Sequence, residues 1–334
     1  MTDRNVQVNE TDSNANVAMK PQKSLISKLS LGQYGIVWGL VAMCIALTFL
    51  SPYFLHQRNL LNVARQSSMN AIIAAGMTIV IISAGIDLSV GSLLAFSSCV
   101  MAIPLKAGWP LGICLVIGLV VGGLCGLVNG VLITKGRLPP FIATLGMMSV
   151  ARGGALVLLI GEPIAGFKEN FRWIGEGYIG PLPMPVVVAI VVYVVLNITM
   201  TQTRFGRYTY SIGGNEEAAR LSGVSIALHK NVIYMISGVC AAIAGIILTA
   251  RLGSAQPIAG VSYELDAIAA VVIGGTSLAG GRGNLIGTVV GALIMGVLRN
   301  GLNLLNVNPF WQQVVIGLVI LAAVLADEAR KGSK

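Results

Sequence analysis

Long apolar stretches separated by short polar ones follow one another along most of the chain. A helix that spans a membrane needs about 20 predominantly apolar residues. By this measure the pattern predicts about ten transmembrane segments, near residues 34–52, 69–86, 88–105, 110–133, 140–161, 183–200, 231–250, 264–281, 284–305 and 310–326. We therefore expect an all-α polytopic membrane protein.

Two regions of this pattern are less regular than the rest. The stretch 69–105 could contain a broken or re-entrant piece, and 264–305 is polar and rich in glycine in its middle. The exact helix boundaries in both regions stay open at this point.

The polar ends of the chain complete the predicted organisation. Residues 1–30 are expected to be a disordered cytoplasmic tail, 31–328 a single transmembrane domain and 329–334 a second cytoplasmic tail. With both ends inside, fourteen Lys and Arg residues fall in cytoplasmic segments and seven in outer segments, among them Arg299. This bias agrees with the positive-inside rule.

Composition supports a membrane protein and argues against several other classes. Hydrophobic residues make up 55% and charged residues 10% of the 334 positions, whereas soluble domains carry about 25% charged residues. The net charge of +9 is explained by cytoplasmic loops, so no nucleic-acid partner is expected. The five cysteines lie in apolar stretches without a CxxC pair and are interpreted as small hydrophobic residues.

A weak internal repeat and two rows of glycine suggest how the segments pack. At an offset of 196 residues, Ala71, Ile72, Ala74, Gly85, Gly91 and Ser92 align with Ala267, Ile268, Ala270, Gly281, Gly287 and Thr288. Five predicted spans separate the copies, so the two five-helix halves would be inverted, as in many transporters. The glycine rows are predicted to let helices pack closely; they comprise Gly118, Gly122, Gly126, Gly130, Gly283, Gly287 and Gly291.

Few ionisable residues lie within the predicted spans, and each has two readings. An intramembrane charge is a functional candidate by default. Asp87 could alternatively cap the next helix, and Asp266 could favour the helix dipole from a first turn. Arg152 could pair with a carboxylate of a neighbouring span.

The sequence shows no pattern for catalysis, metal or nucleotide. His56 and His229 fall on opposite faces of the predicted membrane topology, so they cannot share a metal or a triad. The stretch GGTSLAGGRGN (274–284) has Gly-Arg where a phosphate-binding loop needs Lys-Ser/Thr. We expect no catalytic residue, no metal and no cofactor in this chain.

Residues 213–224, GGNEEAARLSGV, concentrate charge between apolar segments. Charged residues cost ~2.5–3.5 kcal/mol each at a bilayer centre, so this stretch should lie in an aqueous cytoplasmic loop, 201–230. The pattern EAAxxxG (217–223) resembles the EAA loop of ABC importer permeases, the element that docks into the partner ATPase. A later Leu-Pro of the longer consensus is absent.

Longer phrases resemble the ribose-type monosaccharide permeases of ABC importers, and the likeness runs from about residue 24 to 328. These phrases are GIDLSVGS (85–92), TRFGRYTYSIGGNEEAARLSGV (203–224), SAQPIAG (254–260), YELDAIAAVVIGGTSLAGGRG (263–283) and NGLNLL (300–305).

The resemblance implies a type II importer fold and a permease that works as a homodimer or as a pair of different permeases in the bacterial inner membrane. Its partners would be a cytoplasmic ATPase subunit, which binds ATP and Mg, and a periplasmic sugar-binding protein, with lipid around the spans. The cargo would be ribose or a similar pentose or hexose.

On this reading the 213–224 stretch couples the ATPase to transport through Gly213, Gly214, Asn215, Glu216, Glu217, Ala218, Ala219, Arg220 and Gly223. Hydroxyl-rich cargo needs weak, replaceable hydrogen bonds along its path. Side chains that could line that path are Asn70, Asp87, Asn129, Thr144, Arg152, Tyr263, Asp266 and Thr276.

Three alternatives remain at this stage. The cargo could be another small polar solute, such as a signalling sugar or a branched-chain amino acid. The chain could instead be a secondary carrier driven by an ion gradient, or a membrane scaffold without transport.

Overall fold

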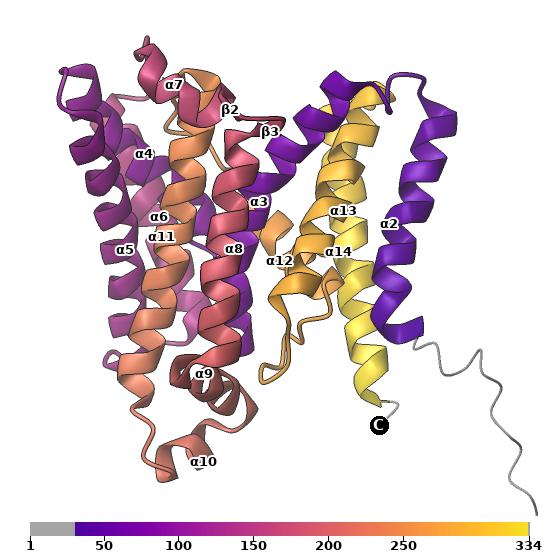
Figure 1. Ribbon diagram of the computed structural model, residues 1–334. Coiled ribbons are helices and arrows are strands. Elements are labelled where there is room, and N and C mark those ends of the chain that lie inside the picture. The colour runs from indigo at the N-terminus through magenta and orange to yellow at the C-terminus, as the bar shows by residue number, and fades with distance from the viewer. Residues whose placement is uncertain (1–30, 333–334) are drawn as a thin grey trace, which may run out of the picture. The chain divides into compact units, whose positions relative to one another are not determined.

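A computed structural model describes residues 31–332, so the predicted tail at 1–30 lies outside the described residues. Contacts divide the chain into units 1–35 and 36–334, and the arrangement described below is that of the second unit. Its helices surround a bundle interior, and their bounds are α2 Leu31–Leu50, α3 Gln57–Ile82, α4 Val90–Lys106, α5 Leu111–Thr134, α6 Pro140–Leu159, α7 Glu169–Glu176, α8 Met184–Gln202, α9 Arg204–Gly214, α10 Glu216–Leu221, α11 Ile226–Leu252, α12 Tyr263–Ile273, α13 Leu285–Leu304 and α14 Pro309–Gly332 (Figure 1).

The strands are minimal. β1 (Ile164–Ala165) pairs antiparallel with β4 (Ser254–Ala255), and β2 (Tyr178–Ile179) forms a hairpin with β3 (Leu182–Pro183). Figure 1 places α7, β2 and β3 at the end of the bundle opposite α9 and α10. The all-α class expected from the sequence is therefore confirmed.

Helix α3 forms the centre of the bundle. Of its most apolar 18 residues, 83% are buried, against 22% for α8, whose apolar surface faces outward. The side chains of α3 contact α11, α13, α12 and α8. The apolar outer face of α8 suits a lipid environment, because lipid tails are as apolar as these side chains and burying the face would bring no hydrophobic gain.

Each of the ten predicted spans overlaps a helix, but not all of these helices are long enough to cross a membrane. Among the described residues, six helices are long and apolar enough to cross a membrane: α3, α5, α6, α8, α11 and α13. Shorter apolar helices cover Gly35–Leu50, Val90–Lys106 and Pro309–Leu325.

The continuous span predicted at 264–281 is wrong. Helix α12 ends at Ile273 after 11 residues, about 16 Å at 1.5 Å per residue, roughly half of a bilayer core. The chain then turns through 274–284, where Gly275, Gly280 and Gly281 have positive φ angles. Only glycine adopts such angles without steric cost, so the apolar run could not continue as one helix.

The start of α3 also differs from the predicted boundary at residue 69. The helix begins at Gln57, because the polar side chains of its first turns find partners on neighbouring helices. Asn59 exchanges two hydrogen bonds with Asn300 of α13, and Asn62 accepts one from Arg251 of α11. An apolarity count overlooks a helix whose polar face is paired in this way.

The glycine rows pack helices together, as predicted. On α5, Gly122 and Gly126 face the carbonyl groups of Gly238 and Tyr234 on α11. On α13, Gly287 and Gly291 face the carbonyl groups of Gly274 and Ala270 at the end of α12. A side chain at any of these four positions would strike backbone, which cannot move aside as a flexible side chain can.

The positions aligned by the internal repeat fall on equivalent elements. The first copy runs from α3 through 83–89 into α4, and the second from α12 through 274–284 into α13. Each copy is thus a helix, a break and a helix. The inverted relation between the halves stays a prediction.

Close packing of α5 on α11 predicts that Gly126→Val destabilises the protein by about 1–3 kcal/mol through overpacking. Gly146→Val on α6 is the matched control, since no atom lies within 4 Å of the position its Cβ would take. Thermal unfolding of the two purified variants in detergent measures the difference. Equal melting temperatures would show that the α5–α11 contact is looser than described.

Candidate functional site

Helix α10 is a short element fixed at both ends by its own residues. The Asn215 side chain accepts a hydrogen bond from the Ala218 amide at 2.9 Å and caps the N-terminus. At the other end Gly223, with φ +84°, donates to the Arg220 carbonyl, and Val224 donates to that of Ala219. These two bonds form a Schellman motif, in which glycine relieves strain.

The charged stretch is two helices rather than one. Gly213 and Gly214 end α9, and Asn215, in an extended conformation, separates it from α10. An asparagine that caps one helix cannot continue the preceding one, because its backbone must leave the helical region.

The side chains of α10 divide between the chain and the solvent. Ala219 is buried against the chain, whereas Ala218 is exposed and Leu221 is 79% exposed. Glu217 pairs with Arg220 at 2.6 Å, and the hydrogen bond and charge of that glutamate raise the pKa of the guanidinium. The outward face of α10 thus combines an apolar side chain with a charged pair.

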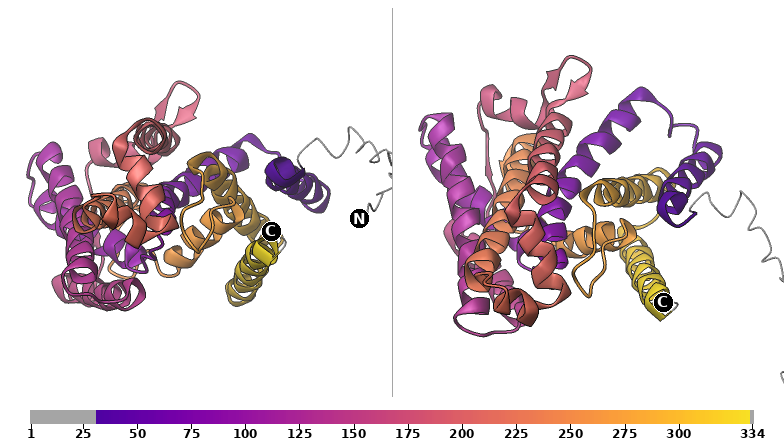
Figure 2. Two further views of the ribbon diagram at one scale, coloured as in Figure 1. Left: turned by 90° about the horizontal axis from the view of Figure 1, so that it is seen from below. Right: turned by 60° about the horizontal axis from the view of Figure 1, so that its bottom comes forward.

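Helix α9 connects α10 to the breaks in the two repeat copies. Gly281 donates a hydrogen bond of 2.9 Å to the carbonyl of Ile82, the last residue of α3. Gly213 packs directly against the same carbonyl and against the Gly281 amide, and Tyr210 donates to the Gly283 carbonyl at 2.9 Å. Figure 2 shows the 274–284 loop extending beside α9 when the bottom comes forward. We call the meeting of Ile82, Gly213 and Gly281 the junction.

A groove of about 720 Å³ lies beside α10. It is bounded by the 133–140 turn, by α10 and by the start of α11, and four charged residues line it: Arg137, Glu216, Arg220 and Lys230. Lys230 and Glu216 form an ion pair at 2.6 Å across its wall. Its volume lies within the range of about 300–1,000 Å³ that is typical of small-molecule sites.

Three of the predicted path residues form hydrogen bonds that hold the first break, the segment 83–89. Asp87 is fully buried; it accepts hydrogen bonds from the backbone and hydroxyl of Ser89 and from Ser237 of α11. Asn129 of α5 donates to Ser89, and the Thr144 hydroxyl of α6 donates to the Ile86 carbonyl at 3.3 Å. Asp87 does not cap α4, whose N-cap is Ser89.

Arg152 holds the segment 253–262 between α11 and α12. Its guanidinium donates to the carbonyl groups of Pro257 at 2.8 Å and Ala259 at 2.7 Å. It therefore satisfies backbone carbonyls in place of the carboxylate partner considered above. Backbone carbonyl groups shielded from water require such partners.

Asn70, Tyr263 and Asp266 lie together around a small cavity of about 30 Å³ with Gln66, Gly296 and Arg299. Asp266 and Arg299 form an ion pair at 2.6 Å. Gln66 and Arg299 were not predicted from the sequence, and Arg299 was assigned to an outer segment although it lies within α13. Arg299 also lies within the predicted span 284–305. The rule that a charge within a span is a functional candidate could therefore have found it.

The remaining predicted path residue, Thr276, is fully buried in the 274–284 loop beside Gly283. The eight predicted path residues are therefore dispersed over four places. Among the described residues no group of His, Cys, Asp and Glu side chains could hold a metal ion.

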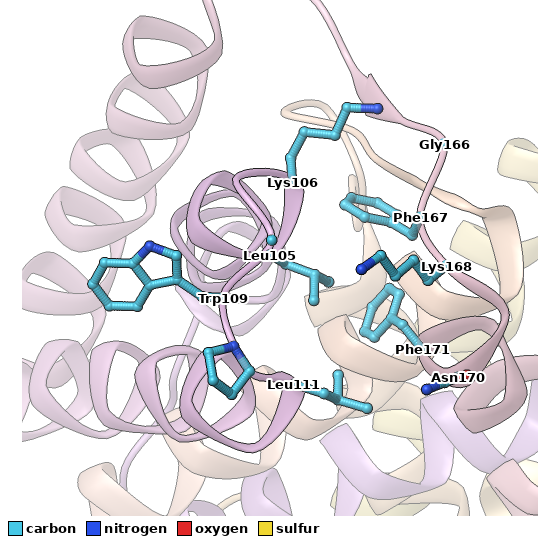
Figure 3. A pocket seen from close by; sticks show the side chains of 11 residues that line it. Leu105, Lys106, Trp109, Leu111, Gly166, Phe167, Lys168, Asn170 and Phe171 are labelled. Atoms are coloured by element: carbon cyan, nitrogen blue, oxygen red, sulfur yellow. The ribbon is translucent and has the colours of Figure 1, made fainter.

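A cavity of about 330 Å³ opens near the end opposite α10, between the 105–111 turn and 166–171. Figure 3 shows the Lys168 amine directed into this cavity and Trp109 pointing away from it. Lys106 donates to the Ala165 carbonyl at 2.8 Å, and the rings of Phe167 and Phe171 meet edge to face at 5.2 Å. Two lysines give this end of the bundle a local positive charge.

Comparison with known proteins assigns the chain to a family. Residues 59–324 match the permease component of branched-chain amino acid transport systems. The chain belongs to this permease family. The matched region runs from the first turn of α3 into α14 and includes both breaks, the junction and α10.

The permease is similar to several curated relatives over most of its length. It is 50% identical to the ribose import permease protein RbsC of Bacillus subtilis (strain 168) over 87% of this chain and 91% of the relative. It is 48% identical to the protein of the same name from Escherichia coli (strain K12) over 90% of this chain and 94% of that relative. It is 41% identical to the D-allose transport system permease protein AlsC of Escherichia coli (strain K12) over 88% of this chain and 91% of that relative. No solved structure matches the permease.

The Arg152 contacts predict that Arg152→Met destabilises the permease by about 3 kcal/mol, since hydrogen bonds to charged groups contribute roughly 1.5–3 kcal/mol each. Arg282→Met, at an exposed position, is the control for loss of an arginine. Thermal unfolding of the purified proteins measures the difference in stability between the two variants. A variant at 152 as stable as the one at 282 would contradict the assigned role.

Proposed function

We propose that this permease is the membrane-spanning subunit of an ATP-driven importer for ribose or a similar pentose or hexose. The observation that carries the proposal is 50% identity to a ribose import permease across about nine-tenths of both chains. The D-allose permease, at 41%, extends the same cargo class. The chain itself contributes the translocation path and the coupling helix α10, and its partner subunit binds and hydrolyses ATP.

The partners follow from this role. A separate cytoplasmic ATPase binds ATP and Mg, a periplasmic sugar-binding protein delivers the cargo, and two permease chains, identical or different, enclose the path. The permease lies in the bacterial inner membrane with both termini in the cytoplasm. This orientation puts α10 beside the ATPase and the lysine-lined cavity near Phe167 beside the binding protein, where it suits an acidic surface.

Alternating access couples these parts. Closure of the ATPase moves α10 as a rigid body, because its two capped ends resist unwinding. Helix α9 carries that movement to the junction, where Gly213 contacts both α3 and the 274–284 loop. One displacement therefore reaches both repeat copies, which suits a change of access at both faces of the membrane.

The family description favours a second candidate cargo, a branched-chain amino acid. The sugar is preferred because the named relatives with 41–50% identity are permeases for ribose and D-allose. An ion-driven carrier is a third possibility, which the same experiment tests.

The proposed function predicts that the permease, reconstituted in vesicles with its ATPase and binding protein, accumulates radiolabelled D-ribose in an ATP-dependent manner. Collapse of the proton and sodium gradients should leave the initial rate unchanged, since ATP supplies the work. Uptake of leucine instead of D-ribose would support the amino-acid cargo. Uptake that needs an ion gradient and no ATP would refute the importer.

The exposed apolar side chain of α10 predicts that Leu221→Gln weakens ATPase binding about tenfold or more, because a buried apolar anchor at an interface contributes over ~1 kcal/mol. Gly223→Val should act similarly by straining the positive-φ end of α10. Titration of the ATPase onto permease in nanodiscs measures the affinity.

Leu252→Gln is the control, because Leu252 is also exposed, at 50%, but lies at the end of α11 remote from α10. Wild-type affinity in both the Leu221 and the Gly223 variants would remove α10 from the ATPase interface.

A further inference from the structure

Three buried polar atoms around the 30 Å³ cavity have no hydrogen-bond partner among the described residues. They are Oδ1 of Asn70, Oδ1 of Asp266 and Nε of Arg299. A buried polar group without a partner costs roughly 1–3 kcal/mol. Three such atoms, from α3, α12 and α13, around one cavity indicate that something polar occupies it.

Arg299 also lines a second and larger cavity, of about 290 Å³, between α12, α13 and α14. This volume is at the lower end of the range for small-molecule pockets. Ser262, Gln312 and Gln313 supply polar groups to it, beside the apolar Val261 and Ile316. Arg299 therefore lines both cavities, whereas its partner Asp266 lines only the small one.

The free groups match the hydrogen-bonding capacity of a hydroxyl group. Two carbonyl-type oxygens can accept and one guanidinium N–H can donate, while a hydroxyl offers one donor and two acceptor sites. The opposite charges of Asp266 and Arg299 offset each other, so the site favours a neutral ligand over an ion. Tyr263 and Gln66 extend the polar wall around the same cavity.

We propose that Asn70, Asp266 and Arg299 form a recognition site for the hydroxyl groups of a neutral sugar within the translocation path. The small cavity takes one hydroxyl group, and the larger one accommodates the rest of a monosaccharide when α12 and α13 separate. This inference rests on the function proposed above and assigns its ligand class to particular side chains.

Asn70→Leu is the sharpest test, because the Oδ1 atom it removes has no partner among the described residues. Asn300→Leu is the matched control at the same α3–α13 interface. It deletes an asparagine that exchanges two hydrogen bonds with Asn59 and lies away from both cavities. Both variants are assembled with ATPase and binding protein in vesicles, and their thermal stability is recorded.

The uptake rates of D-ribose and 2-deoxy-D-ribose are compared at concentrations that saturate the binding protein. In Asn70→Leu the D-ribose rate should fall about tenfold, and the ratio of the two rates should change about 3–10-fold, as loss of one hydrogen bond predicts. In Asn300→Leu the melting temperature should fall while the ratio stays that of wild type. Asp266→Asn should change the ratio as Asn70→Leu does.

Unchanged D-ribose transport in Asn70→Leu would overturn the site and leave an internal water as the occupant. An equal fall for both sugars would also overturn it, because a steric effect does not distinguish hydroxyl groups. These results leave the proposed function intact. A wild-type complex that carries no monosaccharide would overturn both.

Discussion

The constraint behind this structure is that backbone amide and carbonyl groups buried in the protein need hydrogen-bond partners. Helices satisfy it internally, but between helices that pack together this chain leaves the helical conformation at 83–89, 253–262 and 274–284, among other places. Each departure is matched by a specific donor or acceptor. Asp87 serves the first break, Arg152 the second, and the Ile82 carbonyl receives the Gly281 amide in the third.

These breaks place the two repeat copies in direct contact. The turn after Ile273 brings the Gly281 amide to the last carbonyl of α3. Gly213 reaches the same point because it has no side chain. The structural demand for paired backbone thus also brings α9 into contact with both repeat copies.

The two buried carboxylates differ in how completely they are paired. Around Asp87 both carboxylate oxygens accept hydrogen bonds, although Oδ1 of the neighbouring Asn129 has no partner among the described residues. Around Asp266 one oxygen is paired with Arg299 and the other is not. A carboxylate whose two oxygens are paired holds its neighbours in place, whereas an unpaired oxygen can still accept a hydrogen bond.

Much of this protein could be predicted from sequence alone. The long apolar stretches predicted the positions of ten helices, and the glycine rows predicted close packing between helices. Each depends on neighbours along the chain, where spacing is fixed by helical geometry.

Other features depended on residues far apart in the chain. Arg299 pairs with Asp266, the polar start of α3 is helical because of Asn300 and Arg251, and the eight predicted path residues fall into four separate places. Pairing of this kind is set by which helices become neighbours. The sequence by itself therefore determined the helices and the charged stretch between them, and only tertiary packing decided where the chain breaks and which polar groups remain free.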